Sequence, residues 1–263
     1  MSFKEFERLY DVIAKLRDPK DGCPWDLEQT HRSLLKYLQE ETYEYMHAVE
    51  KEDYGKMEEE IGDVLLQVLL HSIIAKQNGK FDLESVSKTL ADKMIRRHPH
   101  VFSDTKVDGV SDIKENWEKI KDQEKEGAKS HYEINEEHLC FPALTSSYKI
   151  GKKTNKLNFD WSDPTQVAYK VEEEWQELKE ELAPYPRFNK ERVKEELGDF
   201  LFSAAQLGRH LGIDPEQALR EANIKFTKRF NKVEDLAKAK NIDMKTTSQD
   251  ELEHLWQEVK QGE

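Results

Sequence analysis

The sequence predicts an all-α protein made of two duplicated helical domains. Apolar residues recur at helical spacing along almost the whole chain of 263 residues, and no segment shows the alternation of apolar and polar residues that is typical of a strand. An ordered series of unlike residues also occurs twice, once in each half of the chain. Such internal similarity is typical of a duplicated domain.

The first half contains five predicted helices. An amphipathic helix begins near Phe3 and ends near Leu16, because Pro19 disfavours helical backbone at the residue before it. Gly79 is the expected stop of the third helix, and Asp112 with Glu115 resembles a capping box for the fifth. The four later helices are predicted at about Thr30 to Glu52, Lys56 to Gln77, Asp82 to Arg97 and Asp112 to Glu126.

Residues 127–139 are predicted to link a first domain, 1–126, to a second domain, 140–263. The segment contains Gly, Ser, Asn and scattered charge but little apolar periodicity. The second half then repeats the plan of the first. Its helix starts are marked by capping residues and by proline at the first helical position: Asp163 before Pro164, Asp214 before Pro215, and Ser248 with Glu251.

Composition limits the class of partner and the compartment. Forty-one basic against 54 acidic residues give a net charge of −13, which argues against binding to nucleic acid or to an anionic membrane but leaves free nucleotides open. Cys23 and Cys140 lie far apart with no C-x-x-C spacing, so a reducing cytoplasm is expected. We expect no signal peptide and no membrane span, because no stretch approaches 18 apolar residues.

One pattern of acidic residues occurs in both halves of the sequence and is the strongest indication of function. Each copy has two carboxylates spaced i, i+3, then a connection, then a second such pair, so two adjacent helices aim four carboxylates into one volume. Four anions stay together only when cations hold them. An all-oxygen ligand set suits Mg²⁺, with Mn²⁺ as a substitute, and Mg²⁺ commonly takes further ligands from substrate phosphates. The eight acids are Glu41, Glu44, Glu60 and Asp63, then Glu174, Glu177, Glu196 and Asp199.

Basic and aromatic residues repeat as well, and they predict a nucleotide site. Pairs of basic residues one helical turn apart suit phosphates, and a tryptophan four residues before a lysine suits stacking on a base. Stacking accepts every base, so broad base tolerance is expected. The candidates are Lys93, Arg97, Trp117 and Lys121 in the first half, and Lys225, Arg229, Trp256 and Lys260 in the second, with Lys170 and Arg192 adding charge.

These residues resemble the MazG family of nucleoside triphosphate pyrophosphohydrolases over essentially the whole chain. The motifs are E-E-x-x-E followed by E-x-G-D in both halves, together with the segments at 22–26 and 96–102. The resemblance implies a four-helix core in each domain, a homodimer, and Mg²⁺-dependent conversion of a nucleoside triphosphate to the monophosphate and pyrophosphate. It also implies that the eight acids bind metal. We assign Glu173 and Glu40, the first glutamates of the two motifs, to orienting or deprotonating the attacking water.

The two copies differ at positions that matter for phosphate binding. Tyr37 stands where the second copy has Lys170, and His98 stands where it has Phe230. We therefore predict that the second domain is the main catalytic site.

Two other functions stay open at this point. A di-iron carboxylate bundle uses Glu-x-x-His pairs, and the chain contains Glu44 with His47 and Glu251 with His254. Neither histidine is repeated in the other copy, which disfavours iron. A non-catalytic helical dimer that senses nucleotides is the second alternative. His98 and His100 are interpreted as packing or capping residues, and Cys23 is not expected to be a nucleophile.

Overall fold

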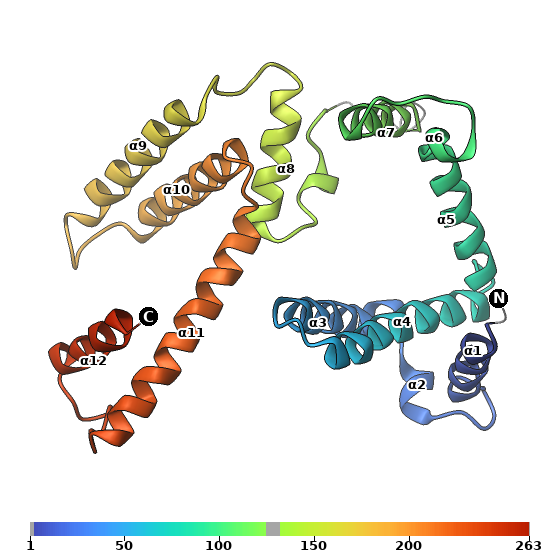
Figure 1. The fold of residues 1–263 in the computed structure, drawn as a ribbon, viewed down its shortest axis with the longest axis horizontal. Helices are drawn as coiled ribbons and strands as arrows, with labels where there is room; N and C mark the ends of the chain where they lie inside the picture. Colours follow the sequence, from blue (N-terminus) through green and yellow to red (C-terminus); the bar gives the residue numbers. More distant parts are fainter. Residues whose placement is uncertain (1–2, 125–131, 263) are drawn as a thin grey trace. The chain divides into compact units, whose positions relative to one another are not determined.

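The computed structural model describes residues 3–124 and 132–262, and within these ranges the chain is helical with no strand (Figure 1). The predicted all-α class is confirmed. The chain divides into two compact units, Met1–Ala128 and Lys129–Glu263. Among the described helices, none is both long enough and apolar enough to cross a membrane.

In the first unit, α3 and α4 form a helix pair and α1 packs against α4. Their apolar faces enclose a core that contains Ile13 of α1, Leu34 of α3 and Leu69 of α4. Burial of such side chains is the main force that holds these helices together. The helices are α1 (Lys4–Leu16), α2 (Pro24–Glu28), α3 (His31–Glu50), α4 (Tyr54–Gln77), α5 (Leu83–Arg97), α6 (Pro99–Phe102) and α7 (Val110–Glu124).

Most predicted boundaries in this unit agree with the structure, and one cap does not. Gly79 has a φ of +64° immediately after Asn78, the C-cap of α4, as a glycine stop requires. The last of the five helices predicted in the first half corresponds to α7, which begins at Val110 instead of Asp112. Asp112 therefore lies in the first turn, where its carboxylate accepts the backbone N–H of Asp108 at 2.9 Å, and the predicted capping box was wrong. The predicted end at Glu126 lies outside the described residues.

In the second unit, α9 and α10 form the corresponding pair, and α8 packs against α10. A smaller cluster of Val233, Ala237 and Leu255 joins α11 to α12. The caps predicted at Asp163, Asp214 and Ser248 are confirmed by side-chain acceptance of backbone N–H groups. The elements are the 3-10 helix η2 (Glu136–His138), α8 (Ala143–Asn155), α9 (Pro164–Leu182), α10 (Lys190–His210), α11 (Pro215–Ala239) and α12 (Gln249–Gln261).

The predicted linker, 127–139, is described only from residue 132 onward. This part contains η2, and Glu133 forms an ion pair of 2.7 Å with Lys153 of α8. The described end of the predicted linker is therefore held against the second unit.

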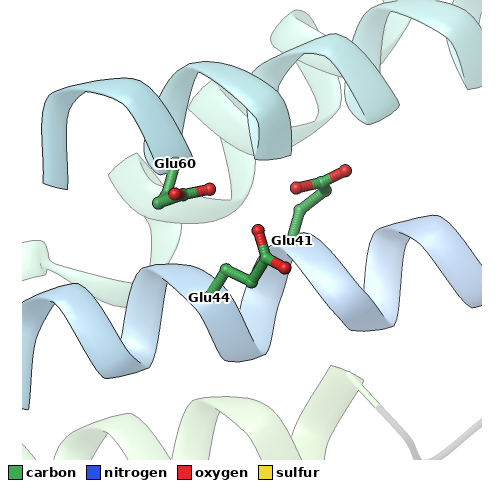
Figure 2. Close-up of side chains that lie close together, drawn as sticks. All are labelled: Glu41, Glu44 and Glu60. Atoms are coloured by element: carbon green, nitrogen blue, oxygen red, sulfur yellow. The ribbon is translucent and has the colours of Figure 1, made fainter. Parts of the chain in front are cut away.

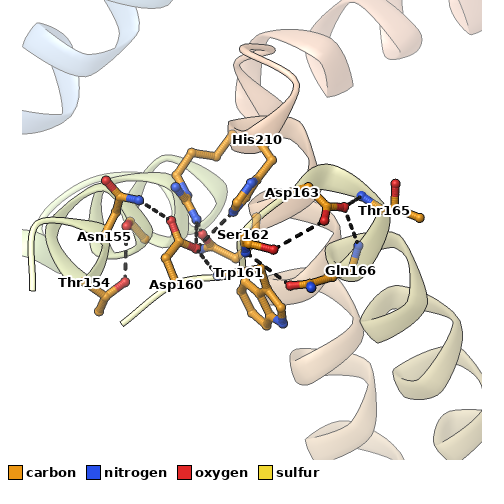
Figure 3. A network of polar contacts seen from close by, with 12 residues as sticks. Thr154, Asn155, Asp160, Trp161, Ser162, Asp163, Thr165, Gln166 and His210 are labelled. Atoms are coloured by element: carbon orange, nitrogen blue, oxygen red, sulfur yellow. Dashed lines mark hydrogen bonds and ion pairs between the residues drawn. The ribbon is translucent and has the colours of Figure 1, made fainter. Parts of the chain in front are cut away.

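A buried polar network fixes the loop before α9 to the end of α10 (Figure 3). Asp160 receives hydrogen bonds from Arg209 at 2.5 Å and Asn155 at 2.8 Å, and it lies 2.9 Å from the His210 ring. Burial opposes the charge of Asp160, but these hydrogen bonds outweigh it and hold the pKa of the carboxyl well below its usual range. Because α9 begins at this loop, the network helps to place α9 beside α10.

Candidate functional site

Both acidic clusters lie between the two paired helices of a unit, where local sequence fixes the helix register. In the first unit, Thr30 caps α3 and Asp53 caps α4. In the second, Asp163 caps α9 and Asn189 caps α10. The i, i+3 spacing then places the acids of each helix on one face, toward the neighbouring helix. Figure 2 shows Glu41 and Glu44 of α3 and Glu60 of α4 pointing into the same space.

The first cluster brings together Glu41, Glu44 and Glu60, each with one carboxylate oxygen within 4.8 Å of the others. Glu60 is only 8% exposed. Desolvation, followed by repulsion from Asp63 and Glu44, raises the pKa of Glu41. Desolvation and the neighbouring Glu60 likewise raise the pKa of Glu44. Both shifts mean that the clustered negative charge is poorly compensated.

The second cluster brings together Glu174, Glu196 and Asp199, again within 4.8 Å. Glu174 and Glu196 are each 6% exposed, whereas Asp199 is exposed. Glu177 lies one turn along α9 from Glu174. Its pKa is raised by desolvation and then by the charges of Glu174 and Glu196, so its carboxylate also belongs to this negatively charged volume.

Each predicted quartet therefore appears as a triplet with a fourth acid beside it. Asp63 is outside the first triplet and Glu177 is outside the second. Besides desolvation, the charge of Asp63 raises the pKa of Glu41, and the charge of Glu174 raises the pKa of Glu177. Both fourth acids are therefore close to their clusters.

Basic side chains form ion pairs with some of these acids, and one of these basic residues was not predicted. Arg192 of α10 donates to Glu196 at 2.8 Å and lies 2.7 Å from Glu195. At the matching position of α4, Lys56 lies 3.6 Å from Glu60. Sequence reasoning selected Arg192 and missed Lys56, although the offset of 136 residues that relates Glu60 to Glu196 also relates Lys56 to Arg192.

Lys170, a predicted phosphate ligand, lies among the acids of the second cluster. Its ammonium is 2.8 Å from both Glu173 and Glu174, and these hydrogen bonds raise the pKa of Lys170. Glu173, a predicted water-orienting residue, is thus paired with a cation. Glu40, its counterpart, lies on the exposed side of α3, and its charge adds to the raised pKa values of Glu41 and Glu44.

The remaining predicted nucleotide ligands of the second unit lie on other helices than the acids. Lys225 and Arg229 belong to α11, and Trp256 and Lys260 belong to α12. The Trp256 ring packs against Phe226, with a centroid distance of 5.1 Å. The predicted basic and aromatic ligands therefore lie on α11 and α12, which meet at Phe226 and Trp256, while the acids gather between α9 and α10.

The first unit repeats this grouping, with Lys93 and Arg97 on α5 and Trp117 and Lys121 on α7. The Arg97 guanidinium lies 5.3 Å from the centroid of the Trp117 ring. Arg97 also forms an ion pair of 2.5 Å with Glu124, and hydrogen bonds from Arg97 and Arg96 lower the pKa of Glu124 to about 2. Arg97 is consequently engaged by an acid of its own unit.

The histidines give no support to an iron site. The His47 side chain is exposed and lies 3.9 Å from Glu50, outside the first acidic cluster. His254 is exposed on α12. His98 caps α5, lies 2.7 Å from the Met94 carbonyl oxygen and packs against Trp117, as expected for a packing or capping residue.

The donor atoms fit Mg²⁺. In the described part of the chain, both candidate groups consist of carboxylates alone, and each includes at least one buried glutamate. Hard divalent ions prefer such oxygen ligands. The raised pKa values of Glu41, Glu44 and Glu177 indicate negative charge that a cation would compensate.

The family model and the curated relatives agree on one family. The sequence model of the MazG nucleotide pyrophosphohydrolase domain matches residues 29–102 and 163–234, which contain all eight acids. A "Nucleoside triphosphate pyrophosphohydrolase/pyrophosphatase MazG" of Thermotoga maritima is 44% identical over 98% of this chain and 96% of its own length. A "Nucleoside triphosphate pyrophosphohydrolase" of Escherichia coli K12 is 38% identical over 98% of each chain. A crystal structure titled as a mazG-related protein from Thermotoga maritima is 33% identical, with a TM-score of 0.39, over 44% of this chain and 98% of that one.

Proposed function

Because the chain belongs to the MazG nucleotide pyrophosphohydrolase family, we propose that it hydrolyses nucleoside triphosphates, ribo and deoxy, to the monophosphate and pyrophosphate. The observation that carries this proposal is the convergence of carboxylates from two paired helices in each unit. Mg²⁺ is the proposed cofactor, and Mn²⁺ is its expected substitute. We further propose broad base tolerance and a cytoplasmic location, the latter because both cysteines are free thiols.

The acids of the second unit would hold the metal, namely Glu174, Glu177, Glu196 and Asp199. Bound there, Mg²⁺ would supply Lewis acidity toward the phosphates and lower the pKa of a coordinated water. The first unit offers the equivalent ligands Glu41, Glu44, Glu60 and Asp63.

The other residues of the second unit would bind and orient the substrate. Lys170 and Arg192 place two positive charges beside the acids, where a phosphate chain must lie. Glu173, next to Glu174 on α9, would accept a proton from the attacking water or orient it once Lys170 turns to phosphate. Trp256 would stack on the base, and such stacking does not discriminate between bases.

The second unit is the proposed main catalytic site. Its cluster would offer both Lys170 and Arg192 to the phosphates, whereas Lys56 makes the one ion pair to the first triplet among the described residues, and Tyr37 stands at the position of Lys170.

We also propose that the protein works as a homodimer. Large apolar side chains on α10 and α11 are exposed in the single chain, among them Leu201 at 45% and Phe226 at 57%. Gly198 lies within α10, yet a Cβ at this position would meet no atom of the described residues within 4 Å. Glycine lowers helix stability, and a glycine on an open helix face allows close approach of another helix. A second copy of the chain is the proposed occupant of this face.

The test is a panel of ribo- and deoxynucleoside triphosphates with Mg²⁺, assayed separately for pyrophosphate and orthophosphate. The proposal requires pyrophosphate as the first product, similar turnover across bases, and loss of activity in EDTA. Orthophosphate as the first product would contradict cleavage between the α- and β-phosphates. Nucleotide binding with no pyrophosphate release would favour a nucleotide-sensing protein instead.

A further inference from the structure

The two acidic clusters differ by the order of two neighbouring residues. The first helix of each pair carries a lysine and a tyrosine one turn before its acids, as Lys36-Tyr37 in α3 and as Tyr169-Lys170 in α9. One residue along a helix corresponds to a rotation of about 100°. The exchange therefore moves the lysine from one face of the helix to another.

In the second unit this order directs the ammonium to the metal ligands. Lys170 lies 2.8 Å from Glu174, which is itself a member of the buried triplet, and 2.8 Å from Glu173. Tyr169 is exposed. The second cluster is thus paired with two cations of its own, Lys170 on α9 and Arg192 on α10.

In the first unit, the reversed order of lysine and tyrosine directs the lysine ammonium away from the acids. The Lys36 ammonium lies over the Tyr37 ring, 4.5 Å from its centroid, and Tyr37 packs against Trp25. Among the ion pairs of the described residues, none reaches Glu41 or Glu44. Lys56, the counterpart of Arg192, supplies the ion pair to this cluster.

A divalent ion in the second cluster must compete with the Lys170 ammonium for Glu174, whereas none of the ion pairs of the described residues involves Glu41, the matching acid of the first cluster. The Lys56–Glu60 pair of the first cluster has its counterpart in the Arg192–Glu196 pair of the second and so does not distinguish them. Repulsion between a divalent ion and one added positive charge a few ångströms away corresponds to roughly tenfold in affinity even where water screens it well. Nucleotide phosphates would remove this competition, because they accept hydrogen bonds from lysine and ligate the metal as well.

We infer that the first cluster binds a divalent ion in the absence of nucleotide, whereas the second cluster binds its ion tightly only together with a nucleotide. The order of lysine and tyrosine before the acids sets this difference. The inference rests on the proposed function, since it assumes that both clusters are metal sites. Linkage then requires that metal and nucleotide strengthen each other's binding in the second unit.

The test measures Mn²⁺ binding to the full chain by electron paramagnetic resonance, one cluster at a time. Glu44→Gln with Glu60→Gln silences the first cluster and leaves the second to be measured. Glu177→Gln with Glu196→Gln does the reverse. Without nucleotide, the first cluster should bind Mn²⁺ at least about tenfold more tightly than the second cluster does. Saturating α,β-methylene-ATP should tighten Mn²⁺ binding at the second cluster by at least about tenfold.

The decisive variant exchanges the two residues without changing composition or net charge. Tyr169→Lys with Lys170→Tyr, made where the first cluster is silenced, should tighten nucleotide-free Mn²⁺ binding by about tenfold. Lys170→Met should give a similar gain and shows that the lost ammonium, not the new tyrosine, is the cause. Circular dichroism melts establish that each variant is folded.

Two results would overturn the inference while leaving the proposed function intact. One is equal nucleotide-free affinity of the two clusters, or tighter binding by the second. The other is an affinity at the second cluster that neither exchange of Tyr169 and Lys170 nor Lys170→Met changes. Absence of Mn²⁺ binding at both clusters, with and without α,β-methylene-ATP, would overturn both the inference and the metal assignment of the proposed function.

Discussion

The chemistry of each unit depends on how a few carboxylates share their negative charge. Glu41 and Glu44 have raised pKa values because they are desolvated and lie beside other acids. A group whose pKa is raised by folding binds more protons in the folded state, so it reduces stability as the pH rises through its folded pKa. At neutral pH the ionised Glu41 and Glu44 therefore reduce the stability of the metal-free fold.

This charge repulsion can be tested by neutralising one acid. Glu44→Gln should raise the melting temperature in EDTA, because it removes repulsion with Glu60. The same change should reduce the increase in melting temperature that Mg²⁺ gives the wild-type chain. Glu59→Gln is the control, since Glu59 is paired with Lys56 at 2.7 Å and lies outside the triplet. A lower melting temperature for Glu44→Gln in EDTA would contradict the proposed repulsion.

The unequal roles of the two units can be tested by removing matched acids. Glu177→Ala should lower kcat/KM for pyrophosphate release by about 100-fold, the loss expected when metal-assisted charge stabilisation is weakened by several kcal/mol. Glu44→Ala, at the matching position of the first unit, should cost less than about tenfold. Steady-state kinetics with one triphosphate compare them, and a larger loss from Glu44→Ala would reverse the assignment.

The sequence could predict which acids gather but not which three approach most closely. The i, i+3 spacing fixes the helix face, and thus selected all eight acids. The closest triplets omit Asp63 in one unit and Glu177 in the other, because side-chain rotamers and counter-charges such as Lys170 decide the final distances. Lys56 was missed because a lysine near the start of a helix rich in Lys and Glu is usually solvated.

At the scale of the helices, capping residues were the most reliable guide. The starts of α9, α11 and α12 follow the predicted caps. Two short helices, α2 of five residues and α6 of four, were not predicted, since fewer than two turns give too little periodicity to recognise. The start of α7 was misplaced because Asp112 accepts from Asp108 within the first turn instead of capping it.

Packing of α8 against α10 depends on a glycine. A Cβ at Gly151 would collide with the side chains of Gln206, which is buried, and Arg209, which is half-buried. Both side chains are held by hydrogen bonds, to Ser147 and Asp160 respectively. Gly151→Ala should therefore destabilise the protein by about 1–3 kcal/mol despite the better helix propensity of alanine. Urea denaturation measures this change. A stabilised Gly151→Ala variant would contradict the close approach of the two helices.

The pair α3 and α4 contains a histidine that should make the first unit sensitive to acid. His71 lies 2.7 Å from His31, ring nitrogen to ring nitrogen. Desolvation, and then the charge of His31, lower the pKa of His71. The unfolded chain then binds more protons, so stability should fall as the pH drops below about 6.5, the ordinary value for histidine.

Replacing this ring tests the expected acid sensitivity. His71→Leu introduces the residue found at the matching position, Leu207, and should flatten the loss of stability between about pH 6.5 and 5. His47→Leu, on the exposed side of α3, is the control. Chemical denaturation at a series of pH values measures the change. An unchanged slope for His71→Leu would show that another group causes any acid sensitivity.

At the scale of the whole molecule, the internal repeat predicted which residues of the two units are equivalent better than it predicted which residues lie close together. Lys225 matches Lys93, and Trp256 matches Trp117, and in each unit these residues lie on a second pair of helices, apart from the helices that carry the acids. Matching positions identify equivalent residues but do not say which helices meet within one chain. The proposed homodimer would supply the missing neighbours of the exposed apolar face.

The proposed dimer can be tested by charging that face. Leu201→Glu should convert the protein to a monomer, because a carboxylate buried between two copies would lose its hydration without a partner. Leu211→Glu is the control, as Leu211 is similarly exposed, at 55%, in the turn after α10. Analytical ultracentrifugation distinguishes the two. A Leu201→Glu dimer, or a wild-type monomer at micromolar concentration, would contradict the proposed assembly.

The most direct measurement is Mg²⁺-dependent pyrophosphate release by the full chain and by one variant in which all four acids of the second unit become amides. The variant carries Glu174→Gln, Glu177→Gln, Glu196→Gln and Asp199→Asn, and circular dichroism verifies its helix content. We predict pyrophosphate and monophosphate from the wild-type chain and a loss of at least about 1,000-fold in the variant. Undiminished hydrolysis by the folded variant would contradict the role of these carboxylates.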